Sequence, residues 1–215
     1  MGTRAAAIYL AHLNPFTNAH EKIISLLEKD YRVYIFPVRF VKGNQEVNTR
    51  SFPFPYAVRK AMIESVYGDC NKDIMILPTY TFKSPFVKYF PPIFSPYSWH
   101  LRTQIIKAIE EEDFVSYTGN KAERLMLDMY CLRPLKANRL ELSASEVRTT
   151  LYDYAISEKK KQIERERTAP SWHNKIPKKT ISIIEENWTI IQSFASSQDN
   201  TIKICGMKFP KNGFL

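Results

Sequence analysis

The sequence has little glycine and little cysteine, and it lacks a long hydrophobic run. Only 6 of its 215 residues are glycine, which excludes a polyglycine loop as the phosphate-binding element. The three cysteines show neither a CxxC pattern nor the cysteine–histidine spacing of a zinc site, so we expect no resident metal. No apolar stretch is long enough for a membrane span and no signal segment is recognisable. We therefore expect a soluble cytoplasmic protein with no membrane partner.

The charge of the chain is strongly one-sided, with a formal net charge of +9 at pH 7. Such a surplus suits anionic partners, among them nucleotides and RNA. The densest basic run, residues 159–167, is interleaved with glutamates, a pattern typical of a solvated helix face. The charge alone does not choose among these partners, and this pattern makes RNA the less favoured of them.

Apolar runs and helical periodicities alternate along most of the chain. Strands are expected at residues 5–11, 31–38, 73–77, 114–117 and 138–142. Helices are expected at residues 18–29, 56–67, 100–112, 120–129 and 144–154. This order predicts a doubly wound, Rossmann-like α/β fold with a parallel sheet of about five strands. We divide the chain into an α/β core (1–155), C-terminal helices packed on it (156–195) and a loosely attached polar tail (196–215).

Residues 79–99 interrupt the alternation with aromatic side chains and prolines, which exclude a continuous helix. One interpretation is a lid in which Trp99 stacks on the ring of an acceptor substrate. We slightly favour packing, or contact with a second copy of the chain in a homo-oligomer, because most aromatic loop residues do not bind ligands.

The first predicted strand runs directly into HLNPFTNAH (residues 12–20), which opens a helix. Parallel α/β sheets bind ligands at the carboxyl ends of their strands, and a helix start offers free backbone N–H groups to phosphate. A histidine in that first turn, His20, can donate to a phosphate oxygen on which charge develops.

The segment LNPFTNAHEKII resembles the first signature of the HxGH nucleotidyltransferase superfamily, and it is most similar to phosphopantetheine adenylyltransferases. The resemblance implies that Thr17 and His20 are catalytic residues that contact a triphosphate. It also implies that the loop with Leu13, Asn14 and Phe16 approaches the phosphates with its backbone.

A second motif, LSASEVR at residues 142–148, resembles the ISSTxxR signature of the same superfamily. Ser143 and Ser145 add hydroxyl donors at a helix start, and Arg148 can clamp phosphate oxygens with its planar fork. Alone, these would be an ordinary helix cap and a surface arginine. Two motifs in the expected order, each at a strand-to-helix junction, favour the phosphate-binding interpretation.

Weaker likenesses lie between the two motifs. Lys42 follows the second strand, and Arg59 begins the second helix, where this family places groups that meet the acceptor. The segment with Thr118 and Asn120 resembles one that lies near the adenine in nicotinamide mononucleotide adenylyltransferases. The plainer interpretations stay open: a solvated lysine, an Arg59–Glu64 ion pair, and a turn followed by a helix cap.

Together these likenesses imply an adenylyltransferase that moves AMP from ATP, with Mg²⁺, to the phosphate of a small acceptor and releases pyrophosphate. Nicotinamide or nicotinic acid mononucleotide is the first choice of acceptor, and phosphopantetheine is the second. A cytidylyltransferase acting on a phospho-alcohol is an alternative. A catalytically silent nucleotide- or RNA-binding protein is another, since Ala19 stands where the family has glycine, no acidic residue precedes Pro15, and the net charge is +9.

Overall fold

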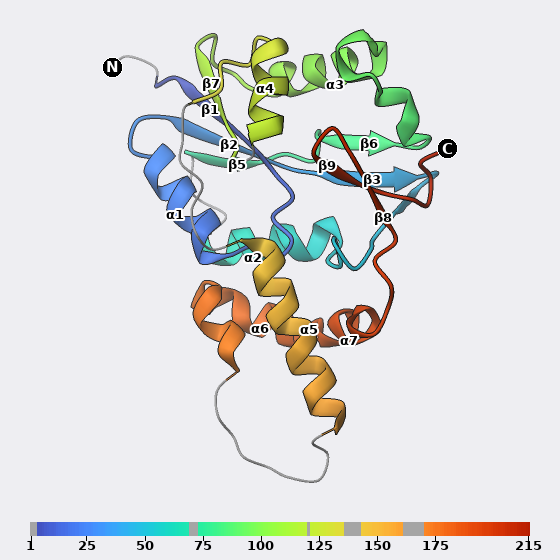
Figure 1. The fold of residues 1–215 in the computed structure, drawn as a ribbon. Coiled ribbons are helices and arrows are strands. Elements are labelled where there is room, and N and C mark those ends of the chain that lie inside the picture. The colour runs from blue at the N-terminus through green and yellow to red at the C-terminus, as the bar shows by residue number, and fades with distance from the viewer. Residues whose placement is uncertain (1–3, 69–72, 120, 136–142, 161–169) are drawn as a thin grey trace.

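The computed structural model describes residues 4–68, 73–119, 121–135, 143–160 and 170–215. Its centre is a parallel sheet in the order β5-β2-β1-β7 (Figure 1). The strands are β1 (Ala6–Ala11), β2 (Arg32–Pro37), β5 (Ile74–Ile76) and β7 (Phe114–Tyr117). The doubly wound α/β fold is thereby confirmed with four described strands, and the strand expected at 138–142 lies outside the described residues.

Helices cover both faces of this sheet (Figure 1). One face carries α1 (Asn18–Leu27), α2 (Tyr56–Tyr67), α5 (Ala144–Lys160), α6 (Ile181–Glu186) and α7 (Trp188–Ala195). The other face carries α3 (Pro96–Lys107) and α4 (Lys121–Met129). Alternate residues of β1 enter two separate cores, with Tyr9 on the first face and Ile8 and Leu10 on the second. Burial on both faces explains why this strand is apolar throughout.

The aromatic segment 79–99 packs into the second core. It contains β6 (Thr81–Lys83), the 3₁₀ helices η1 (Phe86–Tyr89) and η2 (Pro92–Phe94), and the start of α3. β6 pairs in parallel with β3 (Arg39–Lys42), which also pairs with β4 (Gln45–Glu46). Phe82, Phe86 and Tyr89 are buried. The packing interpretation of this segment is confirmed for these three rings.

Helix α3 begins four residues before its expected start at His100. The hydroxyl of Ser95 accepts a hydrogen bond from the backbone N–H of Ser98 and caps the helix. Pro96 occupies the first helical position, where its missing N–H costs nothing. Pro96 is one of the prolines that we expected to exclude a helix, but it forms the first residue of α3.

The C-terminal helices also differ from expectation. Helix α5 runs without interruption to Lys160, across the expected boundary at residue 155. After it come the 3₁₀ helices η3 (Ser171–Lys175) and η4 (Lys178–Thr180). Helices α6 and α7 meet at Asn187, whose side-chain amide donates to the carbonyl of Ile183. Competition of this kind with the backbone ladder is typical of asparagine.

Residues 196–215 contain a β-hairpin where we expected a loosely attached polar tail. β8 (Thr201–Ile204) and β9 (Met207–Pro210) pair antiparallel around Cys205 and Gly206, which both have positive φ. Two such residues form the turn that suits the twist of a hairpin. Phe209 is 2% exposed, with ring contacts to Phe40 and Phe82. The apolar side of the hairpin is therefore part of the second core.

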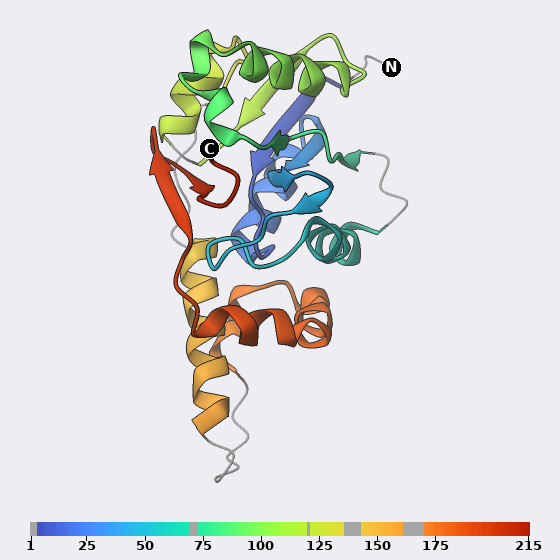
Figure 2. The ribbon, with the colours of Figure 1, turned by 90° about the vertical axis from the view of Figure 1, so that its right-hand side faces the viewer.

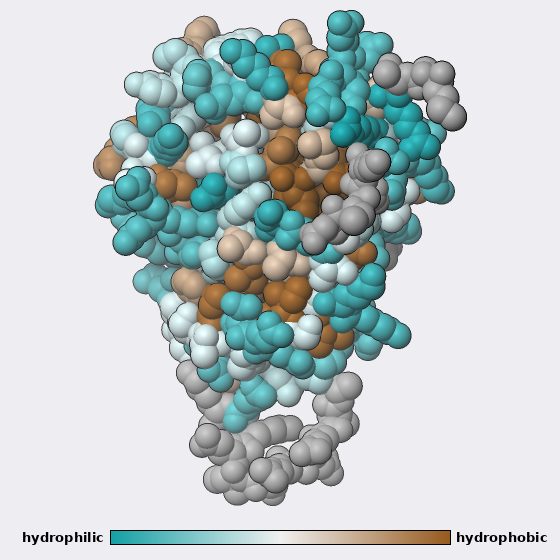
Figure 3. Space-filling view, turned by 180° about the vertical axis from the view of Figure 1, so that it is seen from behind, coloured by the Kyte–Doolittle hydropathy of each residue, from teal (hydrophilic) through white to brown (hydrophobic). Residues whose placement is uncertain are grey.

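The face of the molecule behind the view of Figure 1 is mostly polar, with hydrophobic residues gathered near its middle (Figure 3). Within the described part of the chain, no helix is both long and apolar enough to cross a membrane.

Candidate functional site

A cleft of about 770 Å³ lies at the carboxyl ends of β1 and β7. This volume is in the range of binding sites for small ligands. Its walls are the loop after β1, the first turns of α1, α4 and α5, and the β8–β9 hairpin. Three helix N-termini therefore meet at one cavity, and each contributes partial positive charge. The position agrees with the rule that parallel sheets bind ligands where their strands end.

His20 lines this cleft from the first turn of α1. The hydroxyl of Thr17 accepts the backbone N–H of His20, and Nδ1 of His20 accepts the backbone N–H of Thr17 at 3.1 Å. Because Nδ1 is an acceptor, the proton of the neutral ring is on Nε2. Thr17 itself is fully buried and does not line the cleft. It positions His20, which offers one N–H to a ligand.

His12, the residue directly after β1, also lines the cleft, with its ring stacked on Phe52 at a centroid distance of 4.2 Å. Burial, followed by the charges of Arg59, Arg148 and Lys208, lowers the pKa of His12 to about 3. Burial and then the charge of Arg148 likewise lower the pKa of His20 to about 3. Both imidazoles are therefore neutral at pH 7 and act as hydrogen-bond groups, while the positive charge comes from other side chains.

The rest of the first motif supports the cleft from behind. The side-chain amide of Asn14 donates to the carbonyl of Phe54 at 2.8 Å and accepts the backbone N–H of Phe54 at 3.0 Å. Phe16 is fully buried, with its ring 5.8 Å from that of His20. Of these loop residues only Leu13 lines the cleft.

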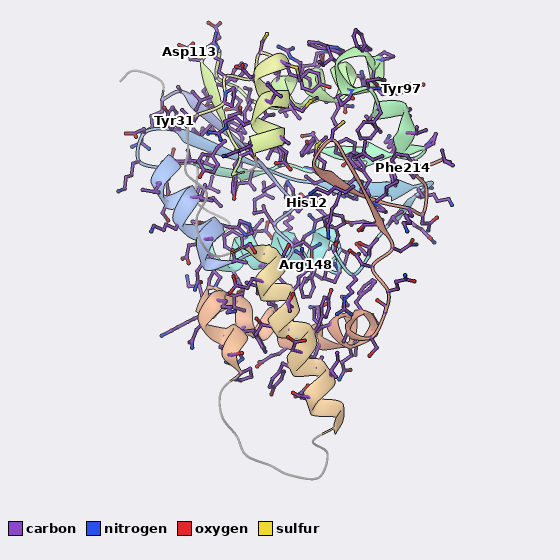
Figure 4. All side chains as sticks on the ribbon, viewed as in Figure 1. His12, Tyr31, Tyr97, Asp113, Arg148 and Phe214 are labelled. Atoms are coloured by element: carbon purple, nitrogen blue, oxygen red, sulfur yellow. The ribbon has the colours of Figure 1, made fainter. Side chains whose placement is uncertain are left out.

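The second motif joins the first through Arg148, which is 8% exposed and lines the cleft. Its guanidinium donates to the carbonyl of Asn14 through Nη1 and to the hydroxyl of Ser145 at 2.9 Å through Nη2. The hydroxyl of Ser143 accepts the backbone N–H of Glu146 and caps α5. Figure 4 shows Arg148 between the end of β1 and the first turns of α5. The two motifs, far apart in the sequence, thus form one structure.

The cleft is strongly cationic. Among its described lining residues Glu123 is the only carboxylate, and it accepts a 2.6 Å hydrogen bond from the hydroxyl of Thr118. The cationic lining residues are Lys121, Arg124, Arg148, Lys203 and Lys208. Asn120, expected beside Thr118, lies outside the described residues. Among the residues that are described, no three His, Cys, Asp or Glu side chains gather as metal ligands would.

Two residues expected to bind the acceptor lie away from the cleft. Nζ of Lys42 donates to the side chain of Asn212 at 2.9 Å. Trp99 packs edge-on against Tyr130 at 5.0 Å, and its indole N–H donates to the carbonyl of Ile93. Neither Lys42 nor Trp99 lines the cleft.

Arg59, the third residue expected to bind the acceptor, lies under the cleft and is 2% exposed. It donates to the carbonyls of His12 at 2.7 Å and Val38 at 2.9 Å, and it forms a 2.8 Å ion pair with Glu46. The expected partner Glu64 pairs instead with Lys60. Arg59 therefore holds the loop after β1 in place. After burial, its positive charge is the next cause that lowers the pKa of His12.

Sequence reasoning missed His12 and the two hairpin lysines, Lys203 and Lys208. His12 stands at the end of a predicted strand, which is the signal that could have identified it. The hairpin has a signal as well, because Gly206 lies in a short turn between segments of alternating apolar residues.

The comparisons with known proteins show similarity in structure alone. No family model and no curated protein matches the sequence. A bifunctional NMN adenylyltransferase/ADP ribose pyrophosphatase from Francisella tularensis superposes with a TM-score of 0.61 and 14% identity over 90% of this chain. The chain spans about half of that protein, 53% of its length.

A second similar structure is the Plasmodium falciparum nicotinic acid mononucleotide adenylyltransferase complexed with NaAD. It has a TM-score of 0.51 and 14% identity, with 89% of this chain and 98% of that chain covered. At such identities the likeness establishes the fold. The chain therefore shares the fold of these two mononucleotide adenylyltransferase structures.

Proposed function

We propose that the protein is a nucleotidyltransferase that moves AMP from ATP to the phosphate of a mononucleotide and releases pyrophosphate. The observation that carries this proposal is the meeting of His20, Ser145 and Arg148 in one cationic cleft at the ends of parallel strands. These residues come from the two motifs that resemble the nucleotidyltransferase signatures, and the fold agrees with them.

The reaction asks little covalent chemistry of the protein. An oxygen of the acceptor phosphate attacks the α-phosphorus of ATP, and the bond from that phosphorus to the bridging oxygen breaks. Pyrophosphate leaves with the electron pair. The acceptor phosphate is already ionised at neutral pH, so no general base is needed. Catalysis then consists of positioning the two substrates and stabilising the charge that develops on phosphate oxygens. Mg²⁺ enters with ATP as part of the donor substrate.

The described residues have separate roles in this scheme. His20 donates its Nε2–H to a phosphate oxygen, with its orientation set by Thr17. Arg148 is held by Asn14 and Ser145 and has further N–H groups for the triphosphate. The lysines and arginines of the walls attract the polyanionic substrates.

Nicotinamide or nicotinic acid mononucleotide is the acceptor that we favour. An apolar pocket lined by aromatic rings adjoins the cleft and shares Leu10, Tyr80, Glu123 and Met207 with it. A flat ring of an acceptor base suits such a lining. The names of the two similar structures support the same choice. Phosphopantetheine remains the second choice because the first motif is most similar to that group.

The test is pyrophosphate release by the purified protein with Mg²⁺. ATP and CTP are each combined with nicotinamide mononucleotide, nicotinic acid mononucleotide, phosphopantetheine and flavin mononucleotide. We expect release with ATP and a mononucleotide. His20→Ala should lower kcat by roughly 10²- to 10³-fold, the typical cost of losing one transition-state donor. His100→Ala is the matched control, since His100 is exposed on α3 and outside the cleft, and it should keep full activity.

The other outcomes are equally informative. Release with CTP alone would make the protein a cytidylyltransferase. Full activity of His20→Ala would remove the histidine from the mechanism. Binding of ATP without turnover of any pair would favour the silent nucleotide-binding alternative. RNA affinity that falls steeply with salt would then be measured next.

A further inference from the structure

The β8–β9 hairpin forms one wall of the cleft, facing residues that come from the two motifs. Lys203, Gly206, Met207 and Lys208 all line the cavity. Figure 2 shows the hairpin on the side of the sheet where the strands end. No step of the proposed function assigns these residues a particular task.

The base of the hairpin is anchored by a network around Asp199. Its carboxylate accepts the backbone N–H and the hydroxyl of Ser51 at 3.0 and 2.7 Å, and the hydroxyl of Thr201 at 3.0 Å. Lys208 lies 3.4 Å from the same carboxylate and donates to the hydroxyl of Ser51 at 2.8 Å. Burial opposes ionisation of Asp199, but these hydrogen bonds and the lysine outweigh it and lower its pKa. The charge of Lys208 is therefore balanced within the protein.

The tip of the hairpin is held as well. Gly206 has φ +80°, and a Cβ placed there would lie 2.8 Å from the Cβ of Ala122 in the first turn of α4. Phe209 is buried just behind the tip. The hairpin is thus fixed at both ends, so a side chain on β8 faces the cleft from a rigid support.

Lys203 is the unbalanced charge of this wall. It lies directly opposite Lys208 in the strand register, so both lysines are on the same side of the hairpin. Like charges directly opposite each other destabilise a strand pair. Lys208 has Asp199 as a partner, whereas Lys203 is exposed and forms no salt bridge with any residue that the structure describes. A bound anion in the cleft would balance the pair.

We propose that Lys203 binds a phosphate group in the cleft, carried by either the ATP or the mononucleotide, and that the C-terminal hairpin is part of the substrate site. This inference rests on the proposed function and extends it to a segment outside both motifs. A charge-assisted hydrogen bond from an ammonium to phosphate, partly screened by water, corresponds to about tenfold in affinity.

The test compares Lys203→Ala with Lys203→Arg and Lys211→Ala. Lys211 is an exposed lysine of the same segment outside the cleft, so its variant controls for the loss of one positive charge. Lys203→Ala should raise the KM of one substrate about tenfold, with kcat changed much less. Lys203→Arg should restore most of the affinity, and Lys211→Ala should behave as the wild type. The substrate whose KM rises identifies the phosphate that is bound.

Direct binding separates failure of this inference from failure of the proposed function. Equilibrium dialysis with ATP and with each mononucleotide needs no turnover. The wild type could be inactive and still bind ATP or a mononucleotide more tightly than Lys203→Ala does. That outcome would keep the phosphate site and reject the transferase. Unchanged KM and affinities in Lys203→Ala would overturn the inference while leaving the transferase intact. A wild-type protein that binds neither ATP nor a mononucleotide would overturn both.

Discussion

The residues that line the cleft include two neutral histidines, which can form hydrogen bonds, and several lysines and arginines, which supply positive charge. His12 and His20 are both held neutral, and the charge of Arg148 contributes to this in each case. A neutral imidazole can donate one hydrogen bond to phosphate without taking up a proton that it would later have to release. Positive charge is supplied instead by the lysine and arginine side chains that line the cleft.

This arrangement makes a prediction about protonation. Because the folded pKa of about 3 for His12 and His20 lies below the ordinary value of 6.5, the unfolded chain takes up protons that the folded chain does not. The stability from the neutral rings is complete above pH 6.5 and is lost as the pH falls toward 3. In an NMR titration of the ligand-free protein, the ring signals of these two histidines should not shift between pH 8 and 5.

The same difference should appear in unfolding experiments. Between pH 6.5 and 3, each of the two histidines adds about 1.4 kcal/mol per pH unit to the slope of unfolding free energy against pH. His12→Gln should therefore flatten the slope relative to wild type. A midpoint near pH 6.5 for either ring in the folded protein would contradict the neutral assignment.

Among the elements, the hairpin approaches α4 closely at its tip, in addition to its anchors at Asp199 and Phe209. Gly206→Ala places a methyl group 2.8 Å from Ala122 at a backbone conformation that suits glycine. Gly43→Ala also places a side chain at a positive φ, +59°, but with no atom within 4 Å. We expect Gly43→Ala to cost about 1 kcal/mol in unfolding free energy and Gly206→Ala roughly 1–3 kcal/mol more.

Urea unfolding of the two glycine variants measures this difference. The gap between them isolates the contact of the hairpin tip with α4 from the backbone strain that both share. Equal losses in the two variants would show that the tip does not rest on α4.

At the scale of the whole molecule, two cores on opposite faces of one sheet hold the cleft walls together. The second core extends to the C-terminus, because Phe209 packs among rings from β3, β6 and the segment after it. Phe209→Ala should therefore destabilise the entire domain by about 3–5 kcal/mol, as for a fully buried aromatic residue. Leu215→Ala, at a side chain that is 94% exposed, should leave stability unchanged.

Thermal unfolding followed by circular dichroism tests this prediction. A single transition that moves to lower temperature in Phe209→Ala is expected, since the hairpin is part of the core. If Phe209→Ala unfolds at the same midpoint temperature as the wild type, residues 196–215 are a loosely attached tail and not part of the core.

The amino-acid sequence by itself determined the parallel sheet and located the two motifs at helix starts for which we propose phosphate binding. Apolar runs and helical periodicity are local signals, so β1, β2, β7 and α2 are found close to where they were predicted. The motifs are local too, because a phosphate site at a helix start uses consecutive residues such as Thr17 to His20. The helix caps at Thr17 and Ser143 belong to the same local chemistry.

Only the tertiary structure decided which side chains meet in the cleft. Arg59 was predicted to bind the acceptor, but it is buried because three oxygen atoms from distant segments surround its guanidinium. Trp99 turns to Tyr130 for a similar reason, since its indole finds packing and an acceptor away from the cleft. Lys203 enters the site because Phe209 anchors the hairpin to a core formed by other segments. Contacts between residues far apart in the chain leave no periodic signal, and packing alone selects among them.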